Sequence, residues 1–155
     1  MSAPVSHPVF VDTNILAYAR DARDLRKKTI ALDWLSFLAK TRTGRLSWQV
    51  LAEFYAVATH PKKLAVPMVA AQADVLSLQH WQPVVPSADL FKAAWGVQDG
   101  YGFSWRDSSI VAAAILSGCK ILLSEDLQHE QMVNNTLQII NPFAPNTPAP
   151  GVYVQ

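Results

Sequence analysis

The chain has 155 residues, half of them apolar, and a formal net charge of +1 at pH 7. This length fits one domain with a single covered core. The near-neutral charge excludes a globally basic nucleic-acid-binding surface, so nucleic acid would have to be attracted by a local patch or by a metal ion. A single cysteine, Cys119, excludes an internal disulfide framework and is typical of a small buried residue in a reducing cytoplasm. We expect a soluble, cytoplasmic protein, because residues 1–7 lack a signal-peptide pattern and no stretch has the ~18 apolar residues of a membrane span.

The first half of the chain alternates short apolar runs with amphipathic patterns. Residues 9–11 are β-branched or aromatic, which predicts a buried strand that turns directly into a helix. Apolar residues then recur at three- and four-residue steps over 25–41, which predicts an amphipathic helix. Residues 46–48 predict a weak strand, and the helix predicted over 50–61 carries Glu53 near its start.

The second half of the chain continues the alternation. Residues 67–78 predict a helix, and 82–85 predict an edge strand, because Pro83 cannot donate a hydrogen bond to a strand ladder. Ser87 is expected to cap the helix that follows. Residues 105–116 predict an Ala-rich, strongly apolar helix.

Two more buried strands, at 121–123 and 137–140, complete the pattern. The order of elements predicts an α/β fold, a three-layer α/β/α domain with a mainly parallel sheet of about five strands. We expect this domain to cover residues 9–140. An N-terminal extension of residues 1–8 would precede it, and a Pro-rich C-terminal tail without periodicity, residues 141–155, would follow it.

Four acidic residues stand where an apolar run stops or a helix opens: Asp12, Glu53, Asp107 and Asp126. If the apolar runs are parallel strands, all four fall at the sheet edge where open α/β proteins bind their ligands. Two carboxylates ~4 Å apart repel by roughly 4 kcal/mol at an effective dielectric constant of 20, so the cluster needs a cation or bound protons. Oxygen-only donors suit Mg²⁺ or Mn²⁺ better than Zn²⁺ or Cu²⁺.

Two of the acids also have a simple structural explanation. Asp12 and Asp107 stand at helix starts, where the helix dipole favours a negative charge without any metal. Asp107, however, shares its helix face with apolar residues, and Glu53 has apolar neighbours, so each needs a polar partner. The sequence has no Gly-x-Ser-x-Gly elbow, Gly-rich phosphate loop or Walker lysine, which leaves a carboxylate-only site.

With these motifs the chain resembles PIN-domain ribonucleases of the toxin type found in bacterial toxin–antitoxin pairs, usually called VapC. The resemblance spans residues 9 to about 140. Four stretches carry it in the expected order: 11–16 (VDTNIL), 49–54 (QVLAEF), 105–114 (WRDSSIVAAA) and 123–128 (LSEDLQ).

The resemblance implies a Mg²⁺- or Mn²⁺-dependent endoribonuclease that cleaves RNA with a metal-activated water. The acids that match the family's metal-coordinating and catalytic carboxylates are Asp12, Glu53, Asp107 and Asp126, and our hypothesis assigns the metal to three of them: Asp12, Asp107 and Asp126. Glu53 would orient or deprotonate the water. The implied pocket-shaping residues are Thr13, Asn14 and Ser124. The resemblance also implies a homodimer and a small cognate VapB-type antitoxin that covers the pocket.

Two features depart from the expected pattern. Glu130 stands where relatives often have Gly, and it adds a negative charge near the pocket. The near-neutral net charge means that few basic residues are available to guide RNA. The candidates are equally suited to a solvated face: Arg20, Arg23, Arg26, Lys27, Lys28, Lys62 and Lys63.

Two other functions stay open from the sequence. One is a catalytically silent binding module for RNA or for an antitoxin. The other is a different Mg²⁺-dependent phosphoesterase, such as a phosphatase or a flap-type DNA nuclease. Phosphatases of the Asp-x-Asp kind are disfavoured, because Asn14 occupies the second acidic position.

Overall fold

A computed structural model of the protein describes residues 7–153. Five strands form one sheet in the order β2-β1-β3-β5-β4. All neighbouring strands are parallel except β4 and β5. The strands are β1 (Val9–Val11), β2 (Gly44–Arg45), β3 (Ile121–Leu123), β4 (Met132–Val133) and β5 (Leu137–Ile140). The predicted α/β fold with a mainly parallel sheet of about five strands is confirmed.

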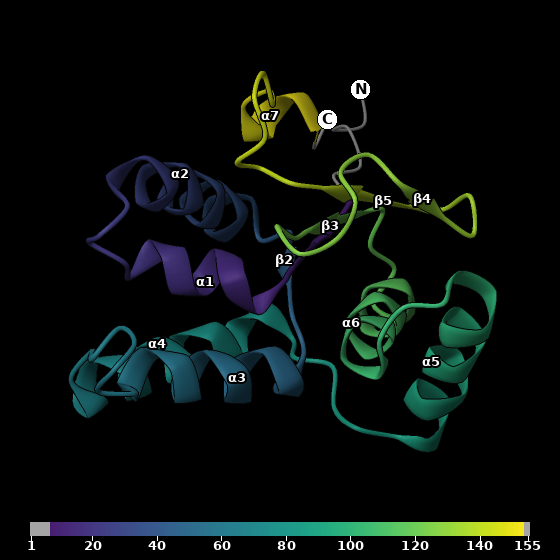
Figure 1. Ribbon diagram of the computed structural model, residues 1–155, viewed down its shortest axis with the longest axis horizontal. Coiled ribbons are helices and arrows are strands. Elements are labelled where there is room, and N and C mark those ends of the chain that lie inside the picture. Colours follow the sequence, from purple (N-terminus) through teal and green to yellow (C-terminus); the bar gives the residue numbers. More distant parts are fainter. Residues whose placement is uncertain (1–6, 154–155) are drawn as a thin grey trace.

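Helices flank this sheet (Figure 1). They are α1 (Thr13–Ala19), α2 (Leu25–Thr41), α3 (Trp48–Thr59), α4 (Met68–Ser77), α5 (Ala88–Tyr101), α6 (Trp105–Leu116) and α7 (Pro150–Tyr153), with a 3₁₀ helix η1 at Leu78–Trp81. Helix α1 packs against both α2 and α3, α4 lies beside α3, and α5 lies beside α6. None of the described helices is both long and apolar enough to cross a membrane.

The strands β1 and β3 explain why charged residues meet at one edge. Every residue of both strands is buried, as their apolar composition predicts. They pair in parallel with Val11 opposite Leu123, and the Asp12 amide donates to the Leu123 carbonyl at 3.0 Å. The side chains that follow the two strands therefore emerge together at the carboxyl edge of the sheet.

Helix α6 forms part of the core, which fits its composition. Seven consecutive residues, 108–114, are buried, so nearly the whole circumference of the helix is covered. Small side chains allow this close packing. Ser104 caps the helix by accepting a hydrogen bond from the Asp107 amide at 3.1 Å, which fixes Asp107 in the first turn.

The predictions for the strands at 46–48 and 82–85 are wrong in detail. Strand β2 lies at Gly44–Arg45 instead, and Ser47 and Val84 form only an isolated parallel bridge. The strand stops because the Ser47 hydroxyl accepts a hydrogen bond from the Val50 amide and so starts α3. Strand β4 was not predicted, since two residues are too few to show an alternating pattern.

The C-terminal stretch from residue 141 packs against the domain. Phe143 is buried, and its ring meets the Tyr18 ring edge-on, with centroids 5.0 Å apart. Arg26 Nη2 donates to the Phe143 carbonyl at 2.8 Å, and the Tyr153 ring lies 5.9 Å from the Trp34 ring. Most of the predicted N-terminal extension, residues 1–6, lies outside the described residues.

Cys119 is buried at the entry to β3, as the sequence predicts. Burial raises the pKa of its thiol to about 11, although a hydrogen bond with Ser117 opposes this shift. The thiol is therefore protonated at neutral pH, which suits a packing role.

Candidate functional site

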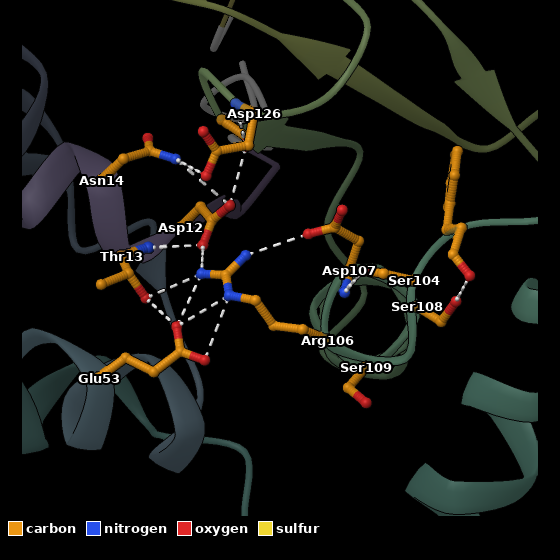
Figure 2. A network of polar contacts seen from close by, with 12 residues as sticks. Asp12, Thr13, Asn14, Glu53, Ser104, Arg106, Asp107, Ser108, Ser109 and Asp126 are labelled. Atoms are coloured by element: carbon orange, nitrogen blue, oxygen red, sulfur yellow. Dashed lines mark hydrogen bonds and ion pairs between the residues drawn. The ribbon is translucent and has the colours of Figure 1, made fainter.

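The four predicted acids come from four different elements at the carboxyl edge of the sheet (Figure 2). Asp12 directly follows β1 and is completely buried, whereas Asp126 lies in the loop after β3 and is exposed. Glu53 projects from the first half of α3, and Asp107 from the first turn of α6; both are partly buried. Three of them surround one basic residue, and the fourth is joined to Asp12 through Asn14.

That basic residue is Arg106, whose guanidinium lies between the acids (Figure 2). Its Nη2 donates to Asp12 Oδ1 at 2.9 Å and to Glu53 Oε2 at 2.7 Å. Its Nη1 donates to Asp107 Oδ1 at 3.1 Å, and its Nε lies 3.1 and 3.2 Å from the two Glu53 oxygens. All three guanidinium nitrogens are thus used. We call Arg106, Asp12, Glu53 and Asp107 the Arg106 cluster.

Hydroxyl and amide groups hold the acids from behind. The Thr13 amide donates to Asp12 Oδ1 at 2.6 Å, and the Ser124 hydroxyl donates to Asp12 Oδ2 at 2.8 Å. The Thr13 hydroxyl donates to Glu53 Oε2 at 2.8 Å. Both oxygens of the Asp12 carboxylate accept hydrogen bonds, so the orientation of this carboxylate is fixed.

Asn14 and Ser124 connect Asp126 to the same site. The Asn14 side-chain amide donates to Asp126 Oδ2 at 3.1 Å and lies 3.5 Å from Asp12 Oδ2. The Asp126 amide donates to the Ser124 hydroxyl at 3.2 Å. Thus each of the three predicted pocket-shaping residues, Thr13 included, lies in contact with at least one of the acids.

The electrostatics of the cluster are uneven. Burial raises the pKa of Asp12 above its ordinary value, although hydrogen bonds from Arg106, Ser124 and Thr13 oppose that shift. Burial also acts to raise the pKa of Glu53, but hydrogen bonds from Arg106, Thr13 and Gln49 outweigh it and lower the pKa. For Arg106, the acids overcome the effect of burial and raise the pKa, so the guanidinium is always charged.

The donor atoms suit a hard divalent ion, because they are carboxylate, hydroxyl and amide oxygens. The acids themselves do not converge on one point where an ion could bind. Within residues 7–153, no three or more His, Cys, Asp or Glu side chains lie together as a metal-binding group. The guanidinium of Arg106 lies where these acids face one another, so it serves as the cation of the cluster.

An open cavity of about 520 Å³ lies beside the Arg106 cluster, and we call it the groove. Its wall includes Arg106 and Glu53 from the cluster, together with Asp126. The basic side chains of Arg23 and Lys63 also line it. Asp21 lines it too, so the three basic and three acidic side chains of the wall balance, and attraction of a negatively charged polymer has to come from individual basic groups.

The predicted RNA-guiding residues are not equivalent in the structure. Arg20 pairs with Asp74 at 2.6 Å, and Arg23 pairs with Asp21 at 2.8 Å. Lys63 lines the groove and forms no ion pair with any described residue. Its charge is therefore the most available of those in the groove.

A second group of charges lies next to the first. Lys27 Nζ donates to both Glu125 oxygens, at 2.8 and 3.0 Å, and the Tyr18 hydroxyl donates to Glu125 Oε1 at 3.1 Å. We call Lys27, Tyr18 and Glu125 the Lys27 cluster. Glu125 is therefore held by Lys27 and Tyr18 and forms no contact with Arg106.

Sequence reasoning missed Arg106. It stands next to Asp107 in the quoted motif, but neighbouring residues on a helix point about 100° apart, so a shared target was not expected. One signal was available. In the first turn of a helix a long side chain can reach the strand ends in front of it, and Arg106 is the one basic residue in any of the four motif stretches.

Comparisons with known proteins agree with this architecture. The family model described as the PIN domain matches residues 9–134. No curated protein matches the chain at a significant level.

Several solved structures share the fold. A chain of a toxin–antitoxin complex from Klebsiella pneumoniae is 17% identical with a TM-score of 0.55, covering 87% of this chain and 98% of that one. VapC20 from Mycobacterium tuberculosis, a sarcin-ricin loop cleaving toxin, is 24% identical with a TM-score of 0.53, covering 74% and 86%. VapBC2 from Rickettsia felis, bound to a promoter DNA fragment, is 22% identical with a TM-score of 0.58, covering 84% and 96%. At these identities the likeness is one of fold.

Proposed function

The chain belongs to the PIN domain family, and on that premise we propose that it is a Mg²⁺- or Mn²⁺-dependent endoribonuclease, the toxin of a type II toxin–antitoxin pair. The observation that carries the proposal is the meeting of Asp12, Glu53 and Asp107 from β1, α3 and α6 around one cationic group. Such a concentration of carboxylates beside an open groove suits phosphate chemistry.

The residues divide the work by their position. A divalent ion supplies an activated water and neutralises charge on the phosphate. Asp12, Asp107 and Asp126 would hold that ion. Glu53, fixed by the Thr13 hydroxyl at 2.8 Å and the Gln49 amide at 3.2 Å, would orient or deprotonate the water. Thr13, Asn14 and Ser124 keep the carboxylates in place.

RNA would enter through the groove. Lys63, which lies in the same lining as Glu53 and Asp126, would contact the phosphate backbone. An open groove of this kind fits a single-stranded loop better than a stacked duplex, since loops present phosphates and bases that can be splayed apart.

The direct test maps new RNA 5′ ends after brief induction of the wild-type chain, beside Asp107→Asn as the matched control. We expect ends that cluster at one site in one RNA and that appear only with the wild type. Identical maps from the two chains, with the wild type folded and free of antitoxin, would remove the basis for catalysis.

A silent binding module is the second candidate, and one observation favours it. Arg106 already neutralises part of the acid cluster, so the fold does not need a metal to hold these carboxylates together. Calorimetric titration with Mn²⁺ separates the two functions. Nuclease function requires binding that disappears when Asp12→Asn and Asp107→Asn are combined, whereas a module needs no such binding.

We also propose a small VapB-type antitoxin as partner and action in the cytoplasm, where both RNA and antitoxin are found. The support is that a neighbour of similar fold, the chain from Klebsiella pneumoniae, comes from a toxin–antitoxin complex. Co-purification of the chain with the product of an adjacent small reading frame tests this partner.

A homodimer is proposed through one exposed aromatic face. Phe91, Trp95 and Trp105 are all exposed, and the Phe91 ring lies 5.4 Å from Trp105 and 5.9 Å from Trp95. Contiguous exposed aromatics on a small domain indicate a contact surface. Light scattering should give twice the chain mass for the wild type and a monomer for Trp95→Glu; an unchanged dimer would place the interface elsewhere.

A further inference from the structure

The guanidinium of Arg106 forms ion pairs with three carboxylates at once. Its Nη2 lies 2.9 Å from Asp12 and 2.7 Å from Glu53, and its Nη1 lies 3.1 Å from Asp107. Among residues 7–153, no other basic group forms an ion pair with any of these three acids. Arg106 alone therefore offsets their mutual repulsion.

One positive charge does not balance three carboxylates, so the cluster keeps room for a stronger cation. A divalent ion brings twice the charge to a smaller volume, and repulsion between carboxylates a few ångströms apart is strong in a partly buried site. The guanidinium binds Asp12 Oδ1 and Asp107 Oδ1, which belong to two of the acids proposed as metal ligands, so an ion between these acids would compete with it for the same two carboxylates.

The surroundings of Asp12 and Arg106 show which of the two side chains can move. Asp12 is fully buried and is held by Thr13 and Ser124, so it cannot turn away. Arg106 has a long side chain that is 35% exposed, and it forms part of the groove wall. Its guanidinium can move into that open space without disturbing the core.

We propose that Arg106 is a latch, a resident cation that holds the acids in position without metal and that a divalent ion must displace into the groove before it binds. The proposal rests on the proposed function. It makes Arg106 a positioning residue that sets the apparent metal affinity, because only the fraction of molecules with the latch open can accept the ion.

The first test is calorimetric titration of the metal-free chain with Mn²⁺. Arg106→Gln should bind Mn²⁺ roughly tenfold tighter or more, since the competing cation is gone. Arg106→Lys keeps the charge but presents one ammonium in place of a planar fork, so it should also bind more tightly than the wild type. Arg20→Gln is the matched control: it breaks an Arg–Asp pair outside the cluster and should bind like the wild type.

The second test follows the latch itself in the wild-type chain. The ¹⁵N NMR signal of Arg106 Nε, assigned by its loss in Arg106→Gln, should move toward the value of a solvated arginine as Mg²⁺ is added. The Arg20 signal should stay in place.

The outcomes separate the latch from the proposed function. If the wild type binds Mn²⁺ while the Arg106 signal stays unchanged and Arg106→Lys binds no tighter, the latch is wrong and the metal site stands. If neither the wild type nor Arg106→Gln binds Mn²⁺, both are wrong. Weak Mn²⁺ binding by the wild type that moves the Arg106 signal, together with tighter binding by Arg106→Gln and Arg106→Lys, would support the latch.

Discussion

Two charged clusters lie side by side at the carboxyl edge of the sheet, and they are built on opposite principles. In the Lys27 cluster one ammonium meets one carboxylate, Glu125, and the Tyr18 hydroxyl completes the set. In the Arg106 cluster one guanidinium serves three carboxylates, of which Asp12 is completely buried. The first is balanced and the second is not.

The difference shows how a structural ion pair can be told from a site prepared for chemistry. A balanced pair has no use for a further cation, and a partly exposed one adds little to stability. A set of fixed carboxylates with too few cations keeps an excess of negative charge, and this excess favours the binding of a metal ion. The same loop, residues 124–126, supplies Glu125 to the Lys27 cluster and the Ser124 hydroxyl that holds Asp12 of the Arg106 cluster.

The largest expected effect tests the difference between the two clusters directly. Asp107→Asn should lower RNA cleavage by roughly 10²- to 10³-fold, because a lost metal contact removes several kcal/mol of charge stabilisation in the transition state. Glu125→Gln, the same chemical change in the balanced cluster, should leave cleavage within about twofold. Comparable losses in both variants, measured on one purified RNA substrate, would abolish the distinction.

A smaller effect is expected at the groove wall. Lys63→Gln should weaken RNA binding several-fold and reduce the slope of log affinity against log salt by about 1, as for one lost phosphate contact. Its Mn²⁺ affinity should not change, because Lys63 pairs with none of the acids. Fluorescence anisotropy titrations measure this slope in the Asp107→Asn background, where the RNA stays uncleaved. If adding Lys63→Gln to that background leaves the slope unaltered, Lys63 does not contact RNA.

In the metal-free chain, Asp12 and Glu53 of the Arg106 cluster should affect the pH dependence of the free energy of unfolding in opposite directions. The folded pKa of Asp12 is raised above its ordinary value of 3.8, so the folded state binds this proton more tightly than the unfolded state. The contribution of Asp12 to stability is therefore complete below pH 3.8 and is lost as the pH rises through the folded pKa. Glu53 has a lowered pKa and the opposite sign: its contribution is present above pH 4.5 and is lost as the pH falls.

Comparing Asp12→Asn with the wild type isolates the first effect, since Glu53 is present in both. As the pH falls from 7 to 3.8, the wild type should gain free energy of unfolding relative to the variant, with no further change below that. Urea unfolding at a series of pH values measures this difference. A relative loss for the wild type over the same interval would mean that the ion pair with Arg106, and not burial, dominates at Asp12.

The smallest effect concerns the Lys27 cluster. A double-mutant cycle with Lys27→Met and Glu125→Gln should give a coupling energy of about 0.5–1 kcal/mol, because both side chains are roughly one quarter exposed. Thermal or urea unfolding of the four chains provides it. A coupling of several kcal/mol would show that this pair, too, carries stored electrostatic energy.

The central part of the fold could be predicted from sequence because its signals are strong. The runs that form β1 and β3 are apolar and buried at every position, and Ser104 and Ser47 cap α6 and α3 by ordinary hydrogen bonds. The four acids follow from those boundaries, since a strand end or a helix start fixes where each carboxylate emerges.

The peripheral strands and the latch could not be predicted in the same way. Strands β2 and β4 have two residues each, too few for a pattern. A turn signal for β4 was present in the pair Asn134-Asn135, because asparagine tolerates the left-handed region, and both residues have positive φ, 52° and 55°. The reach of Arg106 to Asp12 spans 94 positions in sequence, and only the folded chain brings the two together.

The position of β5 has a consequence for how the chain is made. This strand comes late in the sequence, yet it lies between β3 and β4 in the sheet, and the ring of Tyr153 covers Trp34 of α2. A ribosome that has released only the first 130 residues presents a sheet with β3 as an open edge and α2 with an uncovered tryptophan. The domain therefore completes its core only after the stretch from 137 to 153 has emerged, so the proposed nuclease activity would be withheld until synthesis of the domain is nearly finished.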